Sequence, residues 1–449
     1  MAVLGFFGSR LSAQITVYDP KRVAERSVEN RVNNRVYQGV DKGIDKVEEG
    51  IIGIFKKKPK DKPATPPASD TPSDTQRTKG NDEAPADEPS ERGGKTATAK
   101  TPSLQTYSKF DFIPGSTVLV VEDFAQDVAG DFPSRWNTNS TGEVVTIKDQ
   151  PGRYLMLTKE GVFLPEFITA LPDNFTLEFD LICNEDFSFY SNEIAFVIAA
   201  HNQPGKEFTE WTRFGRGAEG VRVAFHPTNA GNSAGSSAFS SSTGGHEVMK
   251  NEVASNQFWT KRDNHVRVSV WRQKQRLRVY ANEEKLWDLP RAFQPDVKYN
   301  TVLFQTGTFH EEADRYLIGN LRLAVGAPDT RNKLLTEGKF VTTGILFDVN
   351  SARIRPESYG TLKAIAGVLT ETADLRVRIV GHTDADGDDA QNLSLSKKRS
   401  EAVKDALAAE FGIDKNRLET DGKGEAQPAA PNTTPEGKAN NRRVEFIKL

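Results

Sequence analysis

Residues 56–106 contain almost no large apolar side chain and many Pro, Lys, Thr, Ser, Asp and Glu residues. A segment of this composition buries too little apolar surface to offset the entropy of folding, so we predict a disordered linker. As a flexible coil it spans on the order of 40 Å on average. The linker divides a chain of 449 residues, which is longer than one ordinary core supports, into parts that fold separately.

Two segments precede this linker. Residues 1–14, MAVLGFFGSRLSAQ, combine an apolar run with small residues that suit cleavage before Gln14. Arg10 interrupts the run and no Lys or Arg precedes it, so we interpret the segment as an atypical signal peptide. Residues 15–55 are predicted to form an amphipathic helix, because apolar side chains recur mostly four apart. These positions are Val23, Val28, Val32, Val36, Val40, Ile44, Val47, Ile51 and Phe55. The pattern fits both a helix that packs on its own domain and one that docks on another subunit.

Charge and cysteine content exclude several classes of protein. The formal net charge of -3 provides no basic excess, so no nucleic-acid partner is expected. No apolar run is long enough to cross a membrane as a helix. Cys183 is the only cysteine, which excludes an internal disulfide framework and a cysteine zinc site, and we expect this residue to be buried.

Residues 107–327 show short runs of alternating apolar and polar residues separated by turn residues, as in NFTLEFDLI and HVRVSVWRQ. This pattern predicts an all-β domain, a two-sheet sandwich or jelly roll. The stretch at 229–245, NAGNSAGSSAFSSSTGG, is predicted to be a Gly/Ser-rich loop. The stretches DFAQDVAGDFPSRW and LPDNFTLEFDLI resemble the concanavalin-A-like lectin and glucanase (LamG-like) sandwich, and the resemblance is one of pattern.

That resemblance raises the alternative of a carbohydrate-binding lectin or a glucan-active enzyme. Glu178 and Asp180 lie two apart on one strand face, as the two carboxylates of a retaining glycosidase require. The related glucanases carry a third acid on that strand, whereas Ile182 and Cys183 stand at those places here. We therefore predict that Glu178 and Asp180 face solvent and assign no catalytic residue. The five tryptophans suit either sugar stacking or a sandwich core, namely Trp136, Trp211, Trp259, Trp271 and Trp287.

Residues 335–449 alternate between strand and helix patterns. GILFDV, LRVRIV and RRVEFIKL are predicted strands, and helices are predicted to begin at Pro356 and to run from Asn392 to Phe411. The order predicts an α/β domain with helices on one side of a mixed sheet.

Charged residues gather in this domain where the second predicted strand ends. Asp384 follows that strand, while Asn392 and Arg399 share one face of the following helix. Arg442 alternates with Val444 and is expected to point inward. A buried guanidinium needs a carboxylate, so a structural Asp384–Arg399 salt bridge and a site for a charged ligand both remain open.

The stretches ILFDVNSARIRPES, VRIVGHTDADGD, NLSLSKKRS, GIDKNRLETDGKGEAQPAAPN and ANNRRVEF, in this order, resemble the OmpA-like peptidoglycan-binding domain. The resemblance implies that Asp384 and Arg399 hold the diaminopimelate of the peptide stem, with Asn392 and Arg442 as supporting ligands. A carboxylate and a guanidinium together recognise a zwitterion that neither selects alone.

Other polar residues of the same stretch invite a metal assignment. Asp386, Asp388 and Asp389 lack the remaining ligands of a calcium loop, so they are expected to be solvated. His382 has no second histidine or glutamate at ligand spacing, so a structural role is expected. No metal and no cofactor is predicted.

These features together predict an exported, non-enzymatic anchor of a Gram-negative cell envelope. It is expected in the periplasm, associated with peptidoglycan and with the outer membrane. The N-terminal helix and the sandwich are expected to engage an outer-membrane or periplasmic protein complex across the linker. Transport, motility and a structural role stay open at this stage.

Overall fold

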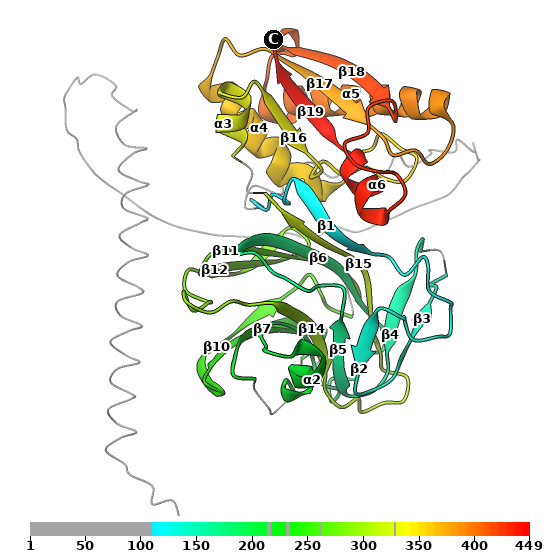
Figure 1. Cartoon of the computed structure of the whole chain (residues 1–449), viewed down its shortest axis with the longest axis vertical. Coiled ribbons are helices and arrows are strands. Elements are labelled where there is room, and N and C mark those ends of the chain that lie inside the picture. The colour runs from blue at the N-terminus through cyan, green and yellow to red at the C-terminus, as the bar shows by residue number, and fades with distance from the viewer. Residues whose placement is uncertain (1–109, 149, 213–216, 230–233, 261–262, 327–328) are drawn as a thin grey trace, which may run out of the picture. The chain divides into compact units, whose positions relative to one another are not determined.

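The computed structural model describes residues 110–148, 150–212, 217–229, 234–260, 263–326 and 329–449 (Figure 1). The predicted signal peptide, amphipathic helix and linker, residues 1–106, lie outside the described residues. The middle part is a β-sandwich and the C-terminal part combines a small sheet with helices, as predicted.

The first sheet of the sandwich is antiparallel and has the order β13-β12-β11-β6-β15-β4-β3, with β1 pairing β15 as well. Its strands are β1 (Thr117–Glu122), β3 (Gly142–Val145), β4 (Tyr154–Leu157), β6 (Asn174–Cys183), β11 (His265–Gln273), β12 (Arg276–Ala281), β13 (Glu284–Leu289) and β15 (Tyr316–Val325). Because side chains alternate along a strand, Phe175, Leu177 and Phe179 of β6 face the core between the sheets.

The second sheet is also antiparallel, with the order β10-β9-β8-β7-β14-β5-β2. Its strands are β2 (Trp136–Thr138), β5 (Gly161–Pro165), β7 (Ile194–Ala200), β8 (Glu219–His226), β9 (Gly235–Thr243), β10 (His246–Ser255) and β14 (Thr301–Thr306). Phe179 meets Phe196 and Phe304 of this sheet edge to face, with ring centroids 5.8 and 5.0 Å apart. Aromatic contacts of this kind join the two sheets into one core.

A short helical segment covers part of the outer face of the second sheet. It consists of α2 (Pro204–Glu207) and the 3₁₀ turn η2 (Phe208–Glu210). Phe208 and Trp211 pack there on Val197 and Leu303. Trp136, Trp211 and Trp287 are buried, whereas Trp259 and Trp271 are half-buried. Cys183 is buried in the sandwich core, as predicted.

The Gly/Ser-rich prediction at 229–245 was wrong for most of its length. Gly235–Thr243 form β9, which pairs with β8 on one side and β10 on the other. Small serine side chains fit a buried strand because they occupy little space and their hydroxyls find partners, as Ser237 does by accepting a bond of 2.9 Å from the indole N–H of Trp287.

The C-terminal sheet has the order β16-β19-β17-β18 and is mixed, since β17 and β18 run parallel and the other pairs antiparallel. Its strands are β16 (Lys339–Thr342), β17 (Val377–His382), β18 (Leu418–Gly424) and β19 (Val444–Lys448). The helical elements are α3 (Thr330–Leu335), η4 (Pro356–Ser358), α4 (Tyr359–Glu371), α5 (Asp389–Phe411), η5 (Lys415–Arg417) and α6 (Pro435–Asn441). In Figure 1, α4 and α5 cover one face of this sheet, and Leu362, Leu369, Val403 and Leu407 share a core with its strands.

The predicted strand GILFDV was wrong, because the strand is Lys339–Thr342, just before it. The chain turns at Gly344, whose backbone N–H donates to Oγ1 of Thr342 at 2.9 Å. A side chain at Gly344 would lie 2.7 Å from Oγ1 of Thr361, so glycine permits this close passage. Ile345 is still buried in the core, although it is not in a strand.

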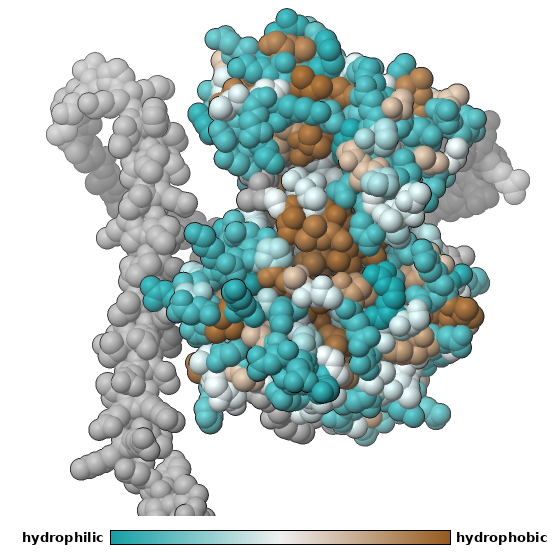
Figure 2. Space-filling view, viewed as in Figure 1, coloured by the Kyte–Doolittle hydropathy of each residue, from teal (hydrophilic) through white to brown (hydrophobic). Residues whose placement is uncertain are grey.

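The sandwich and the C-terminal sheet are joined along β1. The Asn440 side chain of α6 accepts a bond of 2.9 Å from Val118 N–H and donates one of 3.0 Å to its carbonyl. Glu436 accepts a bond of 3.2 Å from Val121 N–H. These bonds occupy backbone groups of β1, whose one partner among the described strands is β15. Figure 2 shows a surface that is largely hydrophilic with an apolar patch over β1, where Leu119 is 43% exposed.

Candidate functional site

The candidate site is built where β17 ends and α5 begins. Gly381 lets α5 approach the strand directly, since a Cβ there would lie 2.2 Å from the carbonyl oxygen of Ser396. The connecting loop ends at Asp388, whose side chain caps α5 by accepting a bond of 3.0 Å from Gln391 N–H. Asp384 is therefore held two residues beyond the carboxyl end of β17.

Asp384 is buried to 8% exposure and forms an ion pair with Nη1 of Arg442. This pairing replaces the Asp384–Arg399 salt bridge that the sequence left open. The inward orientation predicted for Arg442 was wrong, because β19 begins only at Val444 and Arg442 follows the end of α6 with a side chain that is 48% exposed. Arg443 is the buried arginine, and it pairs with Glu445 at 2.9 Å.

Arg399 lies about three turns into α5 and is held by backbone groups. Its Nε donates to the carbonyl of Ser351 at 3.0 Å and its Nη2 to that of Asp348 at 3.5 Å, while its Cζ lies 4.9 Å from the ring centroid of Phe347. Burial lowers the pKa of Arg399, and Arg442 lowers it further, whereas Asp384 raises it. Among the described residues Arg399 has no carboxylate within ion-pair distance, so this partly buried cation is available to an anion.

Asn392 organises the loop around Asp384. It is 6% exposed, and its amide donates to the carbonyl of Asp386 at 3.0 Å and to Oε2 of Glu425 at 2.7 Å. The amide nitrogen also lies 3.4 Å from the carbonyl oxygen of Asp384. The structure thus places Asn392 behind the loop, as a residue that positions Asp384.

His382 lies under the same loop and faces Glu445. It is 3% exposed, and its Nε2 lies 3.5 Å from Oε1 of Glu445. Burial raises the pKa of Glu445, but His382, Lys339 and Arg443 lower it more, so the pKa lies well below its ordinary value. Glu445 is therefore the ionised centre of a buried charge network below the site.

The acidic loop has the solvation that the sequence predicted. Asp386, Asp388 and Asp389 are exposed, and Asp386 pairs with Nζ of Lys438 at 2.7 Å. Within the described ranges no group of three or more His, Cys, Asp or Glu residues has the arrangement of a metal site. None of the helices in the described part of the chain is long and apolar enough to cross a membrane.

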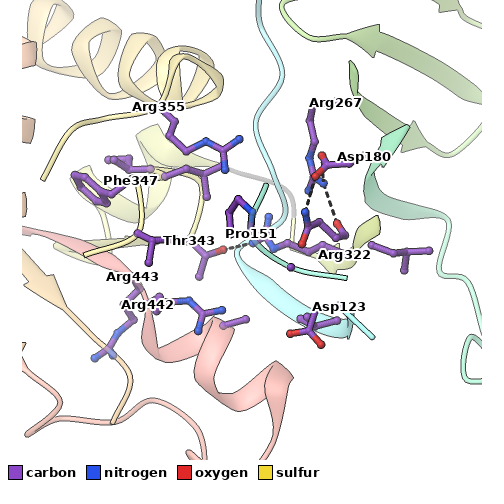
Figure 3. A pocket seen from close by; sticks show the side chains of 18 of the residues that line it. Asp123, Pro151, Asp180, Arg267, Arg322, Thr343, Phe347, Arg355, Arg442 and Arg443 are labelled. Atoms are coloured by element: carbon purple, nitrogen blue, oxygen red, sulfur yellow. Dashed lines mark hydrogen bonds and ion pairs between the residues drawn. The ribbon is translucent and has the colours of Figure 1, made fainter. Parts of the chain in front are cut away.

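Two of the site residues, Arg399 and Arg442, line a cavity of about 720 Å³ between the C-terminal sheet and the sandwich (Figure 3). Arg399, Arg442 and Phe347 line it from the C-terminal side, and Asp123 and Arg153 from the sandwich. The sequence did not predict that Asp123 and Arg153 lie near Arg399, because these residues are far apart in the chain. Phe347 was also not predicted as a site residue, although it lies in the ILFDV stretch that carries the family resemblance.

The solvent-facing prediction for Glu178 and Asp180 was wrong. Both are buried, with Glu178 paired to Arg322 at 2.7 Å and Asp180 to Arg267 at 2.9 Å. Burial raises the pKa of Asp180, but Arg267, together with hydrogen bonds from His265 and Asn320, lowers it well below its ordinary value.

Arg322, the partner of Glu178, also donates to Oγ1 of Thr343 in the C-terminal part at 2.5 Å, so this ion pair lies at a contact between the two parts. Because Arg267 helps to lower the pKa of Asp180, this carboxyl is poorly suited to the proton donation that a glycosidase requires of one acid. The two carboxylates thus act as ion-pair partners beneath the contact between the two parts.

Comparison with known proteins places this site within a family. Residues 346–442 match the family described as OmpA family. Outer membrane porin F of Pseudomonas aeruginosa is 38% identical over 105 residues, which cover 23% of this chain and 30% of the porin. The putative lipoprotein YfiB of Escherichia coli is 38% identical over 107 residues, which cover 24% of this chain and 67% of the lipoprotein.

Among solved structures, the peptidoglycan-associated lipoprotein from Burkholderia pseudomallei is 26% identical, with a TM-score of 0.24, and the match covers 27% of this chain and 98% of that chain. The chain spans less than half the length of porin F, so the likeness concerns the C-terminal domain. Through the domain at residues 346–442, the chain belongs to the OmpA family.

Proposed function

We propose that the C-terminal domain binds peptidoglycan without covalent attachment, through the diaminopimelate of its peptide stem. The observation that carries this proposal is Arg399, a partly buried guanidinium that has no carboxylate within ion-pair distance among the described residues and lies beside the Asp384–Arg442 pair. A cation held in this way favours an anionic group of a ligand, because an unneutralised charge in a low-dielectric site is costly.

Each charged residue has a role in binding the zwitterion. Arg399 takes the carboxylate of the diaminopimelate centre, and Asp384 takes the ammonium. Arg442 neutralises Asp384 in the absence of ligand, and its exposed side chain can move aside or contact a second carboxylate. Asn392 keeps the loop in place through its bonds to Asp386 and Glu425.

At the level of the whole chain, we propose a non-enzymatic envelope anchor. Peptidoglycan and an outer-membrane or periplasmic protein complex are its two partners, and the complex is engaged by the sandwich and residues 15–55. The outer-membrane location of porin F and the lipoprotein nature of YfiB, as their names state, support a place in the periplasm next to the outer membrane.

The proposal is tested by sedimenting the purified chain with peptidoglycan sacculi. The wild-type chain is expected in the pellet, and Asp384→Ala and Arg399→Ala in the supernatant. Arg378→Ala is the matched control, because Arg378 is an exposed arginine of the same domain that pairs with Glu419 at 2.9 Å away from the cavity. Circular dichroism confirms folding, and undiminished pelleting of both site variants would refute the proposal.

A further inference from the structure

The cavity in front of the candidate site has a second wall, which the sandwich supplies. Asp123 follows β1, and Arg153 precedes β4. Both line the cavity into which Arg399 and Arg442 face. A volume of about 720 Å³ suits a ligand larger than one amino acid, because cavities of this size hold molecules as large as drugs.

Most arginines of the cavity already have a carboxylate partner. Arg267 pairs with Asp180 at 2.9 Å, and Arg322 pairs with Glu178 at 2.7 Å. Arg355 pairs with Glu357 at 2.5 Å, Arg443 pairs with Glu445 at 2.9 Å, and Arg442 pairs with Asp384. These ion pairs leave little charge for a ligand to neutralise.

Arg153 differs from these arginines. Its Nη1 donates to the carbonyls of Ala125 at 3.2 Å and of Asp127, which fixes the guanidinium against the turn after β1. No carboxylate pairs with it within the part of the chain that the structure describes. Its charge therefore remains to be neutralised, like that of Arg399, and its orientation is set before any ligand arrives.

Asp123 has the complementary property. Its Oδ1 accepts a bond of 3.0 Å from Ala125 N–H, and no cation among the described residues pairs with it. The cavity thus presents two cations without carboxylates, Arg153 and Arg399, and one carboxylate without a cation, Asp123. The matching ligand is a short peptide that carries more carboxylates than ammonium groups.

We propose that Arg153 and Asp123 form a second subsite for the peptide stem on the sandwich. Arg153 binds a carboxylate of the stem outside the diaminopimelate centre, and Asp123 binds an N–H or ammonium group. The inference rests on the proposed function and extends it, because it makes the sandwich part of the binding site. The stem tripeptide that ends in diaminopimelate, with its additional D-glutamate carboxylate, is the ligand class that this charge pattern favours over the free amino acid.

Isothermal titration calorimetry of the full chain tests the subsite with two probes, free meso-diaminopimelate and the tripeptide L-Ala-γ-D-Glu-meso-diaminopimelate. Arg153→Gln is expected to weaken binding of the tripeptide about tenfold, because one hydrogen bond to a charged group typically changes the Kd by about this factor. Binding of the free amino acid is expected to stay unchanged. Asp123→Asn keeps the acceptor for Ala125 N–H, so it is expected to fold and to weaken tripeptide binding as well.

Arg276→Gln is the matched control, since this sandwich arginine pairs with Asp288 at 2.7 Å and does not line the cavity. If the wild-type chain binds neither probe, the proposed function fails. If the wild-type chain binds both probes and the Arg153 and Asp123 variants bind the tripeptide like the control, the second subsite is refuted. An equal loss for both probes in these variants also refutes it, since that result indicates a general change in the field of the cavity.

Discussion

Replacing Arg399 separates a ligand-binding role from a structural one. In Arg399→Ala, the carboxylate of the ligand loses a charge-assisted hydrogen bond, which contributes about 2 kcal/mol and corresponds to about a 30-fold weaker Kd. Arg399→Lys keeps a positive charge, but one ammonium group cannot donate hydrogen bonds to the carbonyls of Ser351 and Asp348 and to the ligand at the same time. A loss of about 1 kcal/mol, or about fivefold, is expected for the lysine variant.

The same substitution is expected to change stability little. Alanine removes the bonds to Ser351 and Asp348 and the contact with Phe347, and each contributes about 1 kcal/mol or less. It also removes the cost of burying a cation without a carboxylate, which is the main reason that the pKa of Arg399 is lowered. The two effects oppose each other, so the free energy of unfolding is expected to fall by no more than about 2 kcal/mol.

Two measurements on the full chain decide between these roles. Calorimetric titration with the stem tripeptide gives the Kd of each variant, and urea denaturation gives the free energy of unfolding of the C-terminal domain. Wild-type affinity in Arg399→Ala would refute the ligand role. A loss of stability above about 4 kcal/mol would show instead that Arg399 is a structural residue.

Three further predictions concern stability. Because the pKa of Glu445 is lowered in the folded state, the ionised carboxylate stabilises the fold fully above the ordinary pKa of 4.5, and this stabilisation is lost as the pH falls below it. Glu445→Gln is therefore expected to have a lower free energy of unfolding than wild type at pH 7. Denaturation curves should show this difference shrink between about pH 5 and pH 2. Asn440→Ala removes both bonds to the backbone of Val118 and is expected to cost about 2 kcal/mol, with faster amide hydrogen exchange at Val118; unchanged exchange there would contradict the contact between α6 and β1. Gly381→Ala is expected to cost at least 2 kcal/mol, because the new Cβ would lie 2.2 Å from the carbonyl oxygen of Ser396, and a melting temperature equal to wild type would contradict this packing of α5 on β17.

Much of the architecture follows from local patterns. The alternation in Asn174–Cys183 and His265–Gln273 predicted strands that the structure contains, because one face of each is buried against the second sheet. The helix predicted at 392–411 begins three residues earlier, at the Asp388 cap. Strand β9 was missed because its serines break the apolar pattern, although its backbone pairs on both sides.

Residues of the candidate site could be selected from sequence, but their pairing could not. Asp384 lies in the short loop between β17 and α5, and the helical period places Asn392 and Arg399 on one face of α5. Which cation neutralises Asp384 depends on where α6 ends, since Arg442 is 58 residues away in the chain. Glu178 likewise pairs with Arg322, which is 144 residues away in the chain and also contacts Thr343 of the C-terminal part.

The sequence by itself determined that a β-sandwich precedes an α/β domain, and it identified the family motifs that select Asp384 and Arg399. These properties arise from composition and short-range periodicity, which act over a few residues. Only the tertiary structure decided which charges are neutralised and which are left for a ligand, because an ion pair depends on distances between elements far apart in sequence. For the same reason, the second wall of the cavity, with Arg153 and Asp123, becomes visible only once the sandwich and the C-terminal sheet are in contact.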